Sequence, residues 1–368
     1  MPPYHDQSLM IRLCKNWEIV DDINDAKIIM MGTHNLVVDW VKENLKSHQT
    51  LAILDMYHIQ ESDNPEYYID ILKDVTTNVI VIQQNYRFRT ANPENKDKII
   101  WYDHMFDRQK VYCTDYKNEY SLHKCMWTIR CNQEMFKLHP ICKTKHSKIL
   151  SLMRIYQHPN DTLIKSRMLY RKELRDLLSN FESVLMSKPD SGEVFLPKGF
   201  NSVDHAYFTD RGRGGTWLPA SYEFYNNSYI SVYVETLTTD DSTRMHNGNG
   251  YVTEKTFDPM IQGNFVLPFA YPNFIKDCKT LYGFKFPEWI DYSYDAIEND
   301  TDRFESFLSS VKKVNEYSIE DLHNFYIQDS DIIEHNRNVF FNKPYEYNSL
   351  YNKISATVNT KNPHYAYA

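Results

Sequence analysis

One segment in the second half of the chain combines residue types that suit a bound nucleotide. Thr253 can cap a helix, and Glu254 and Lys255 then fall in its first turn, within Gly248-Asn-Gly-Tyr-Val-Thr-Glu-Lys-Thr-Phe-Asp258. N–H groups at a helix N-terminus, with a lysine beside them, favour a phosphate or diphosphate, and a carboxylate there can hold both hydroxyls of a ribose. An ordinary capped helix has the same pattern, so the segment by itself leaves both interpretations open.

Two arginines upstream are further candidates for binding phosphate. Arg211 and Arg213 alternate with glycines in Arg211-Gly-Arg-Gly-Gly-Thr-Trp217. A mobile loop of this composition can close over a phosphate. A surface loop whose arginines contact only water would have the same sequence, so these two interpretations also stay open.

The elements that would position these residues follow from the apolar runs. Four short runs in the first third of the chain are typical of buried strands in a parallel sheet, at 25–32, 50–54, 78–82 and 98–101. An amphipathic helical pattern lies between the first two, at 36–45. Alternating strands and helices indicate an α/β domain, in which ligands gather outside the carboxyl ends of the strands.

A second α/β domain is predicted from about residue 146. Its strands are expected at 148–153, 192–196, 229–235 and 264–268, and its helices at 162–181, from 254 to 262, and at 318–341. At about 150 residues per domain, 368 residues leave room for two domains. We therefore predict two Rossmann-like domains, 1–145 and 146–341, with a tail at 342–368 that could pack back on the first.

Composition and charge exclude several classes of protein. The chain has 41 basic and 49 acidic residues, a net charge of −8, which gives no support to a large duplex-DNA footprint. Its 42% hydrophobic residues exclude disorder throughout. It has no run of 18 apolar residues and no signal-peptide pattern, so we expect a cytoplasmic protein. The six cysteines form no C-x-x-C pair, and we expect no metal site.

Two motifs in the second domain resemble those of glycosyltransferases. The first resembles the donor-site motif of the bacterial α1,3-fucosyltransferase family: Gly250-Tyr-Val-Thr-Glu-Lys255, followed by the apolar run 265–269. The second resembles a motif of related viral and bacterial sequences with a predicted glycosyltransferase function: Gly283-Phe-Lys-Phe-Pro-Glu-Trp-Ile-Asp-Tyr-Ser-Tyr-Asp295. The likeness covers about residues 228–345 and is thin before them.

The resemblance implies the GT-B architecture, in which two Rossmann-like domains face each other across a cleft and the C-terminal one binds a nucleotide-sugar. It implies that Glu254 holds the ribose and that Lys255 neutralises the departing diphosphate. Arg154 would bind phosphate, with Lys165 on the following helix as the alternative. The other donor-binding candidates are Glu235, which ends a predicted strand, Gly250, Tyr251, Thr253, Arg211 and Arg213.

The catalytic base is expected at a strand end of the first domain. Asp55 and Asp103 each follow a predicted strand, and a carboxylate there could deprotonate the acceptor hydroxyl. We favour them over the nearby histidines His34, His58 and His104. An aspartate at a strand end also commonly caps the next helix, which is the structural alternative for each.

The resemblance implies an inverting, metal-independent glycosyltransferase, in which lysines, arginines and helix N-termini would stabilise the charge of the leaving group. It would use a nucleotide-sugar, GDP-linked or UDP-linked, with no further cofactor, and a hydroxyl of a glycan as acceptor. Two alternatives stay open: transfer to a hydroxylated base of viral DNA, which would make nucleic acid a partner, and non-catalytic carbohydrate binding. An NAD-dependent oxidoreductase is disfavoured, because no G-x-G-x-x-G follows the first strand.

Overall fold

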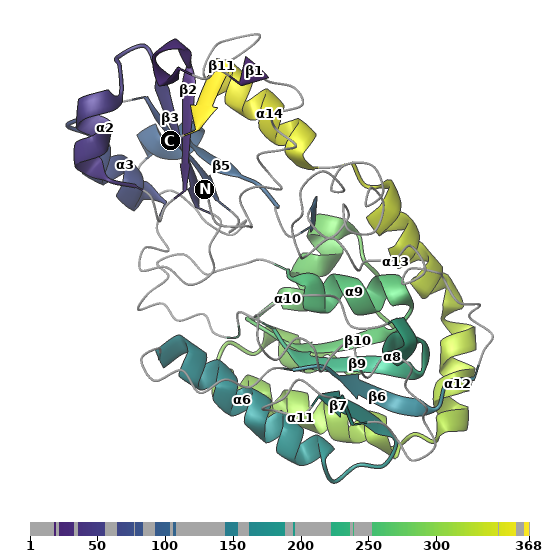
Figure 1. Ribbon diagram of the computed structural model, residues 1–368. Helices are drawn as coiled ribbons and strands as arrows, with labels where there is room; N and C mark the ends of the chain where they lie inside the picture. The colour runs from purple at the N-terminus through teal and green to yellow at the C-terminus, as the bar shows by residue number, and fades with distance from the viewer. Residues whose placement is uncertain are drawn as a thin grey trace. The chain divides into compact units, whose positions relative to one another are not determined.

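The computed structural model describes residues 18–19, 22–32, 36–55, 65–76, 78–83, 93–103, 106–107, 144–153, 162–187, 194–195, 222–235, 238, 252–344, 346–357 and 364–367. They form two compact α/β units with separate sheets. The first gathers the described residues of Met1–Arg108 and Pro344–Ala368, and the second those of Gln109–Asp240 and Val252–Lys343. Both have the Rossmann-like arrangement of parallel strands and flanking helices that the sequence predicts (Figure 1).

The sheet of the first unit has six strands in the order β1-β11-β2-β3-β4-β5, each parallel to its neighbours. The strands are β1 (Glu18–Ile19), β2 (Ile28–Gly32), β3 (Thr50–Asp55), β4 (Val79–Gln83), β5 (Ile99–Trp101) and β11 (His364–Tyr367). The helices are η1 (Ile23–Asp25), α2 (Val38–Asn44), α3 (Glu66–Leu72), η3 (Pro93–Lys98) and α14 (Glu346–Thr357). The four predicted strands are thus confirmed as β2 to β5.

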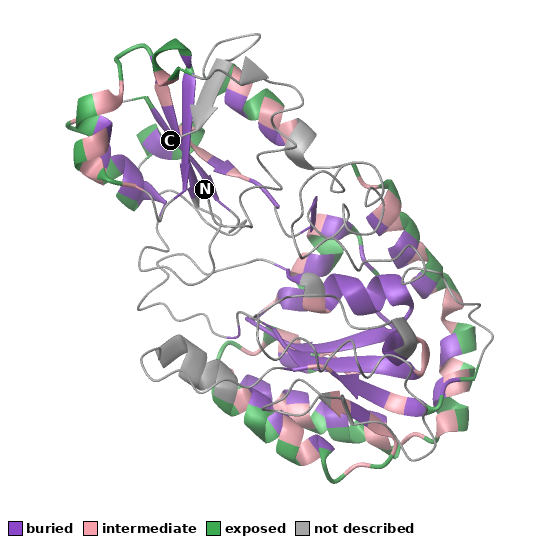
Figure 2. Ribbon diagram, in the orientation of Figure 1, coloured by how far each residue is buried: buried purple, intermediate pink, exposed green. Residues whose placement is uncertain are grey.

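Helices cover both faces of this sheet because its strands are apolar on both sides. On one face, Ile29 and Ile53 of the strands pack with Val41 of α2 and Ile69 of α3. On the other face, the neighbouring strand residues pack with two side chains of α14, Leu350 and Ile354. Strands β2 and β4 are accordingly buried from end to end (Figure 2). Unbroken apolar runs are what a sheet covered on both faces requires.

The C-terminal strand β11 lies between β1 and β2. Residues 365–367 pair with residues 28–30 of β2, and Glu18 and Ile19 of β1 pair with β11 on its other side. The end of the chain therefore completes a sheet that the beginning of the chain starts. The short run at 364–367 has no local pattern that predicts a strand. The strand residues with which it pairs lie more than 300 residues earlier in the chain.

The sheet of the second unit has five strands in the order β10-β9-β6-β7-β8, and only its β7–β8 pair is antiparallel. The strands are β6 (Ser147–Ser151), β7 (Val184–Ser187), β8 (Val194–Phe195), β9 (Ser228–Val234) and β10 (Phe265–Phe269). The helices are α6 (Thr162–Leu178), α8 (Tyr222–Asn226), α9 (Glu254–Gln262), α10 (Phe274–Asp277), the π-helix η5 (Cys278–Tyr282), η6 (Ser293–Ala296), α11 (Asp300–Glu316), α12 (Ile319–Gln328) and α13 (Ser330–Asn342).

Helices also lie on both faces of the second sheet. Phe269 of β10 packs against Tyr170 of α6 and Phe304 of α11 on one face (Figure 1). On the other face, Tyr233 of β9 is hydrogen-bonded to Thr256 of α9. The four predicted strands of this domain are confirmed as β6, β8, β9 and β10, whereas β7, which follows α6 after five residues, was not predicted.

In the part of the chain that the structure describes, no helix combines the length and the apolar character needed to cross a membrane.

Candidate functional site

The connections of the second sheet diverge between β6 and β9. From β6 the chain passes through α6 to β7 on one side, whereas from β9 it passes through α9 to β10 on the other. In open parallel sheets, ligands bind outside the carboxyl ends of the strands at such a point. Arg154 directly follows Met153, the last described residue after β6, and Glu254 and Lys255 open the helix that follows β9. These strand ends are therefore the candidate ligand site of the second unit.

Helix α9 begins with a side-chain cap. The Oγ1 of Thr253 accepts a hydrogen bond from the N–H of Lys255, at 3.3 Å, and its carbonyl accepts from the N–H groups of Thr256 and Phe257. Thr253 has extended backbone angles, as a capping residue should. The predicted cap and the predicted first turn are thus present, and Glu254 is the first residue of the helix.

A buried carboxylate at the end of β9 is hydrogen-bonded to this capping residue. Glu235 directly follows β9 and is 1% exposed. Its Oε1 accepts from the backbone N–H of Thr253, at 3.2 Å, and from the hydroxyl of Thr256, at 3.0 Å. The hydroxyl of Thr253 lies 2.9 Å from Oε1 and 2.6 Å from Oε2, to which it donates. Strand β9 and helix α9 are therefore joined at the point where the helix starts.

Tyr233 extends the same network into the core. Its hydroxyl lies 2.7 Å from the Oγ1 of Thr256. Because Thr256 has one hydroxyl proton and gives it to Glu235, Tyr233 is the donor in this contact. Burial, and then the nearby Glu235 carboxylate, raise the pKa of Tyr233 well above its ordinary value, so the phenol keeps the proton that it donates.

The network changes what the start of α9 can offer to an anion. The backbone N–H groups of Lys255, Thr256 and Phe257 already donate to Thr253. A phosphate at this end would therefore meet the helix dipole and the ammonium group of Lys255 rather than those three N–H groups. The Lys255 side chain is half-buried, with Nζ 3.5 Å from the Oγ1 of Thr253, so its charge stays close to the cap.

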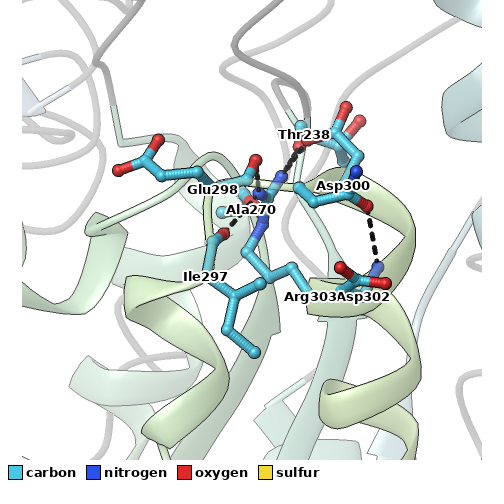
Figure 3. A network of polar contacts seen from close by, with 8 residues as sticks. Thr238, Ala270, Ile297, Glu298, Asp300, Asp302 and Arg303 are labelled. Atoms are coloured by element: carbon cyan, nitrogen blue, oxygen red, sulfur yellow. Dashed lines mark hydrogen bonds and ion pairs between the residues drawn. The ribbon is translucent and has the colours of Figure 1, made fainter.

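A buried arginine joins the loops at the same edge of the sheet. Arg303 of α11 is 1% exposed and uses all five N–H donors (Figure 3). Four go to the carbonyl groups of Thr238, Ala270, Ile297 and Glu298, and one to the carboxylate of Asp300.

Thr238 lies in the connection after β9, and Ala270 directly follows β10. Arg303 therefore determines how the chain leaves both strands. Sequence reasoning missed it because its partners are backbone groups, which have no sequence signal. Its position three residues after Asp300 in a first helical turn was the only local clue.

A second buried arginine lies beneath the end of β9. Arg171 of α6 is buried, and its Nη2 donates to the carbonyl of Val234, the residue before Glu235, at 3.2 Å. Sequence reasoning selected Lys165 on this helix instead, and the structure gives that residue a place in α6 while its side chain is not described.

Several predicted site residues lie outside the described residues: Arg154, Arg211, Arg213, Gly250 and Tyr251. For Glu254 and Asp55 the structure describes the backbone, at the start of α9 and at the end of β3, and not the side chain. The assignments of all these residues remain predictions.

The two candidate bases lie after different strands of the first unit. Asp103 follows β5, is 5% exposed, and its Oδ1 accepts from the backbone N–H of Phe106 at 2.9 Å. This contact is the capping role that the sequence offered as the alternative. Asp55 ends β3, where it pairs in register with Gln83 of β4.

Two aspartate pairs have the D-x-D spacing that can hold a divalent cation, Asp300-Thr-Asp302 and Asp329-Ser-Asp331. In the structure, Asp300 pairs with Arg303, and Asp329 accepts a hydrogen bond from the indole N–H of Trp289 at 3.0 Å. Within the described ranges, no three histidine, cysteine, aspartate or glutamate side chains are grouped closely enough to hold a metal ion.

Comparisons of the chain with protein-family models, with curated proteins and with solved structures found no match.

Proposed function

We propose that this protein is a glycosyltransferase that moves a sugar from a nucleoside diphosphate to a hydroxyl group, with a GDP-linked donor favoured. The observation that carries the proposal is the start of α9. There, the Glu254-Lys255 pair opens a capped helix at the carboxyl edge of a parallel sheet, beside the point where its connections diverge. The resemblance of residues 250–255 to the fucosyltransferase donor motif supports the same assignment.

The proposed reaction requires two kinds of charged group. The acceptor oxygen attacks the anomeric carbon and loses its proton to a base, while the bond from that carbon to the diphosphate oxygen breaks with inversion. The diphosphate already carries about two negative charges at physiological pH and gains one more as the bond breaks, which cations must stabilise. Lys255 is the proposed first contact, with Arg154, Lys165, Arg211 and Arg213 as further candidates, and Asp55 or Asp103 is the proposed base.

Binding of the donor's leaving group tests the proposal directly. Thermal unfolding is measured with GDP, UDP, CDP, ADP and dTDP, each without added metal. One of them should raise the melting temperature, because a ligand at 100 times its Kd stabilises the native state by about 2.7 kcal/mol. Glu254→Ala and Lys255→Met should remove the shift. Lys312→Met, on the exposed side of α11, is the matched control and should keep it. If no nucleoside diphosphate raises the melting temperature, the protein does not use such a donor.

A further inference from the structure

We infer that Glu235 is a positioning residue: it holds Thr253, and through Thr253 the Glu254-Lys255 pair, without contacting the nucleotide. The inference rests on the proposed function for the identity of the ligand. The sequence placed Glu235 among the residues that bind the donor directly.

The burial of Glu235 argues against direct contact with a ligand. The residue is 1% exposed, and its contacts with Thr253 and Thr256 occupy both carboxylate oxygens. Thr253 is also buried and lies between this carboxylate and Lys255. A ligand beside Lys255 would therefore meet the cap first, and Glu235 would support the cap from within the protein.

The contacts restrain the start of the helix at two successive points. Glu235 takes the N–H and the hydroxyl of Thr253, the residue before the helix, and the hydroxyl of Thr256 in its first turn. Glu254 and Lys255 lie between these two anchors. Fixing the backbone on both sides of the pair limits the orientations that its two side chains can adopt. Less conformational entropy is then lost when a ligand binds them.

The hydrogen bonds, and not the charge, should carry this role. A glutamine at position 235 can keep them: its amide oxygen can accept from the N–H of Thr253 and from Thr256, and its NH₂ group can donate to the Thr253 oxygen. A leucine of similar size keeps none of them. The negative charge itself would repel a diphosphate bound nearby, so its loss should not weaken binding.

The experiment compares Glu235→Gln with Glu235→Leu by two measurements at a temperature well below unfolding. Calorimetry with GDP, or with whichever nucleoside diphosphate stabilises the wild type, should give a Kd within about threefold of wild type for glutamine. For leucine, the Kd should rise about tenfold or more, as expected for lost contacts of about 1.4 kcal/mol. Hydrogen exchange should show the amides of Lys255 and Thr256 protected in the wild type and the glutamine variant, and exposed in the leucine variant.

A second pair of variants tests the other side of the contact. Thr253→Ser keeps the hydroxyl and should bind like the wild type, whereas Thr253→Val lacks it and should weaken binding as Glu235→Leu does. The double variant that combines Glu235→Leu with Thr253→Val should lose little more affinity than either single variant, because both substitutions remove the same contact.

The inference is overturned if glutamine weakens binding as much as leucine, which would indicate direct contact of the charge with the ligand. It is also overturned if leucine lowers only the melting temperature and leaves both the Kd and the amide protection unchanged. The proposed function fails separately, when the wild type binds no nucleoside diphosphate. Amide protection then still decides whether Glu235 holds the start of α9.

Discussion

The two α/β units bury their strands alike but differ in the charged groups that they bury. Among the described residues, the buried cations all belong to the second unit: Lys145, Arg171, Arg303 and Arg337. The buried charged side chains described in the first unit are Glu66, Asp103 and Asp107, and the two aspartates follow β5. Because each of these cations donates hydrogen bonds to groups of the second unit, the difference concerns how that unit is held together.

The cations of the second unit are bound mainly to backbone carbonyl groups. Lys145 donates to the carbonyls of Tyr225, Ser228 and Gly263, and lies 4.3 Å from the ring centre of Tyr326. Burial, and then the charge of Arg337, lower the pKa of Lys145 well below its ordinary value. Arg337 donates to the carbonyl of Ile261.

Lys145 and Arg337 thus stabilise the carboxyl end of α9, where the helix dipole is negative. Gly263 ends this helix with φ of +88°, and a side chain there would collide with Arg337. Helix α9 is therefore held at both ends, by Glu235 at its start and by two cations at its finish. In the second unit, the buried charged groups therefore hold one helix and the loops beside it in place.

The largest expected effect tests whether these cations hold the second unit together. Arg303→Met leaves the carbonyls of Thr238 and Ala270 without their donor, and should lower the free energy of unfolding by about 3–5 kcal/mol. Urea unfolding measures this loss. Arg175→Met, on the surface of α6, is the control and should change stability by about 0.5 kcal/mol or less. A loss below about 1 kcal/mol for Arg303→Met would show that the carbonyls find other donors.

The next effect should fall on the first unit alone. A chain that ends at Thr357 lacks β11, which pairs with β1 on one side and β2 on the other. The lost ladder should cost roughly 2–4 kcal/mol, because each hydrogen bond contributes about 0.5–1.5 kcal/mol net. Hydrogen exchange should show faster exchange at 28–30 and unchanged exchange in β9 and β10.

A peptide of residues 358–368 added to the shortened chain should restore protection at 28–30, and a scrambled peptide should not. Unchanged exchange at 28–30 after the truncation would mean that β11 contributes nothing to the stability of the first sheet.

The smallest effect concerns alkaline pH and the buried cluster near Lys145. Burial raises the pKa of Tyr326 to about 12. A raised pKa adds stability that is complete below pH 10, where the unfolded phenol is still protonated, and is lost as the pH rises through the folded pKa. The loss by pH 12 should approach about 2–3 kcal/mol, at about 1.4 kcal/mol per pKa unit.

The free energy of unfolding, measured from pH 9 to pH 12, should therefore fall less steeply for Tyr326→Phe than for the wild type. Taking the difference between the two proteins cancels the part of the contributions of Lys145, Tyr229 and Arg337 that does not depend on Tyr326. Parallel pH profiles would contradict the assignment of the shift to Tyr326.

Each element that could be predicted from the sequence has a signal made by residues that are adjacent in the chain. Runs such as 50–54 and 229–235 are apolar without interruption, and a strand buried on both faces needs nothing else. Thr253 was recognised as a cap from its position before Glu254 and Lys255 alone. The candidate base was narrowed to Asp55 and Asp103 by the same local logic, and the backbone contact of Asp103 shows why a strand-end aspartate is an ambiguous signal.

The amino-acid sequence by itself determined the two α/β units, most of their strands, and the pair of residues that open α9, because these depend on residues adjacent in the chain. Only the tertiary structure decided that β11 lies between β1 and β2, that Arg303 binds the loops after β9 and β10, and that Glu235 is hydrogen-bonded to the capping residue. Each of these depends on backbone groups or side chains that folding brings together from distant parts of the chain. A carbonyl group looks the same in every residue, so its partner cannot be identified before the fold is known.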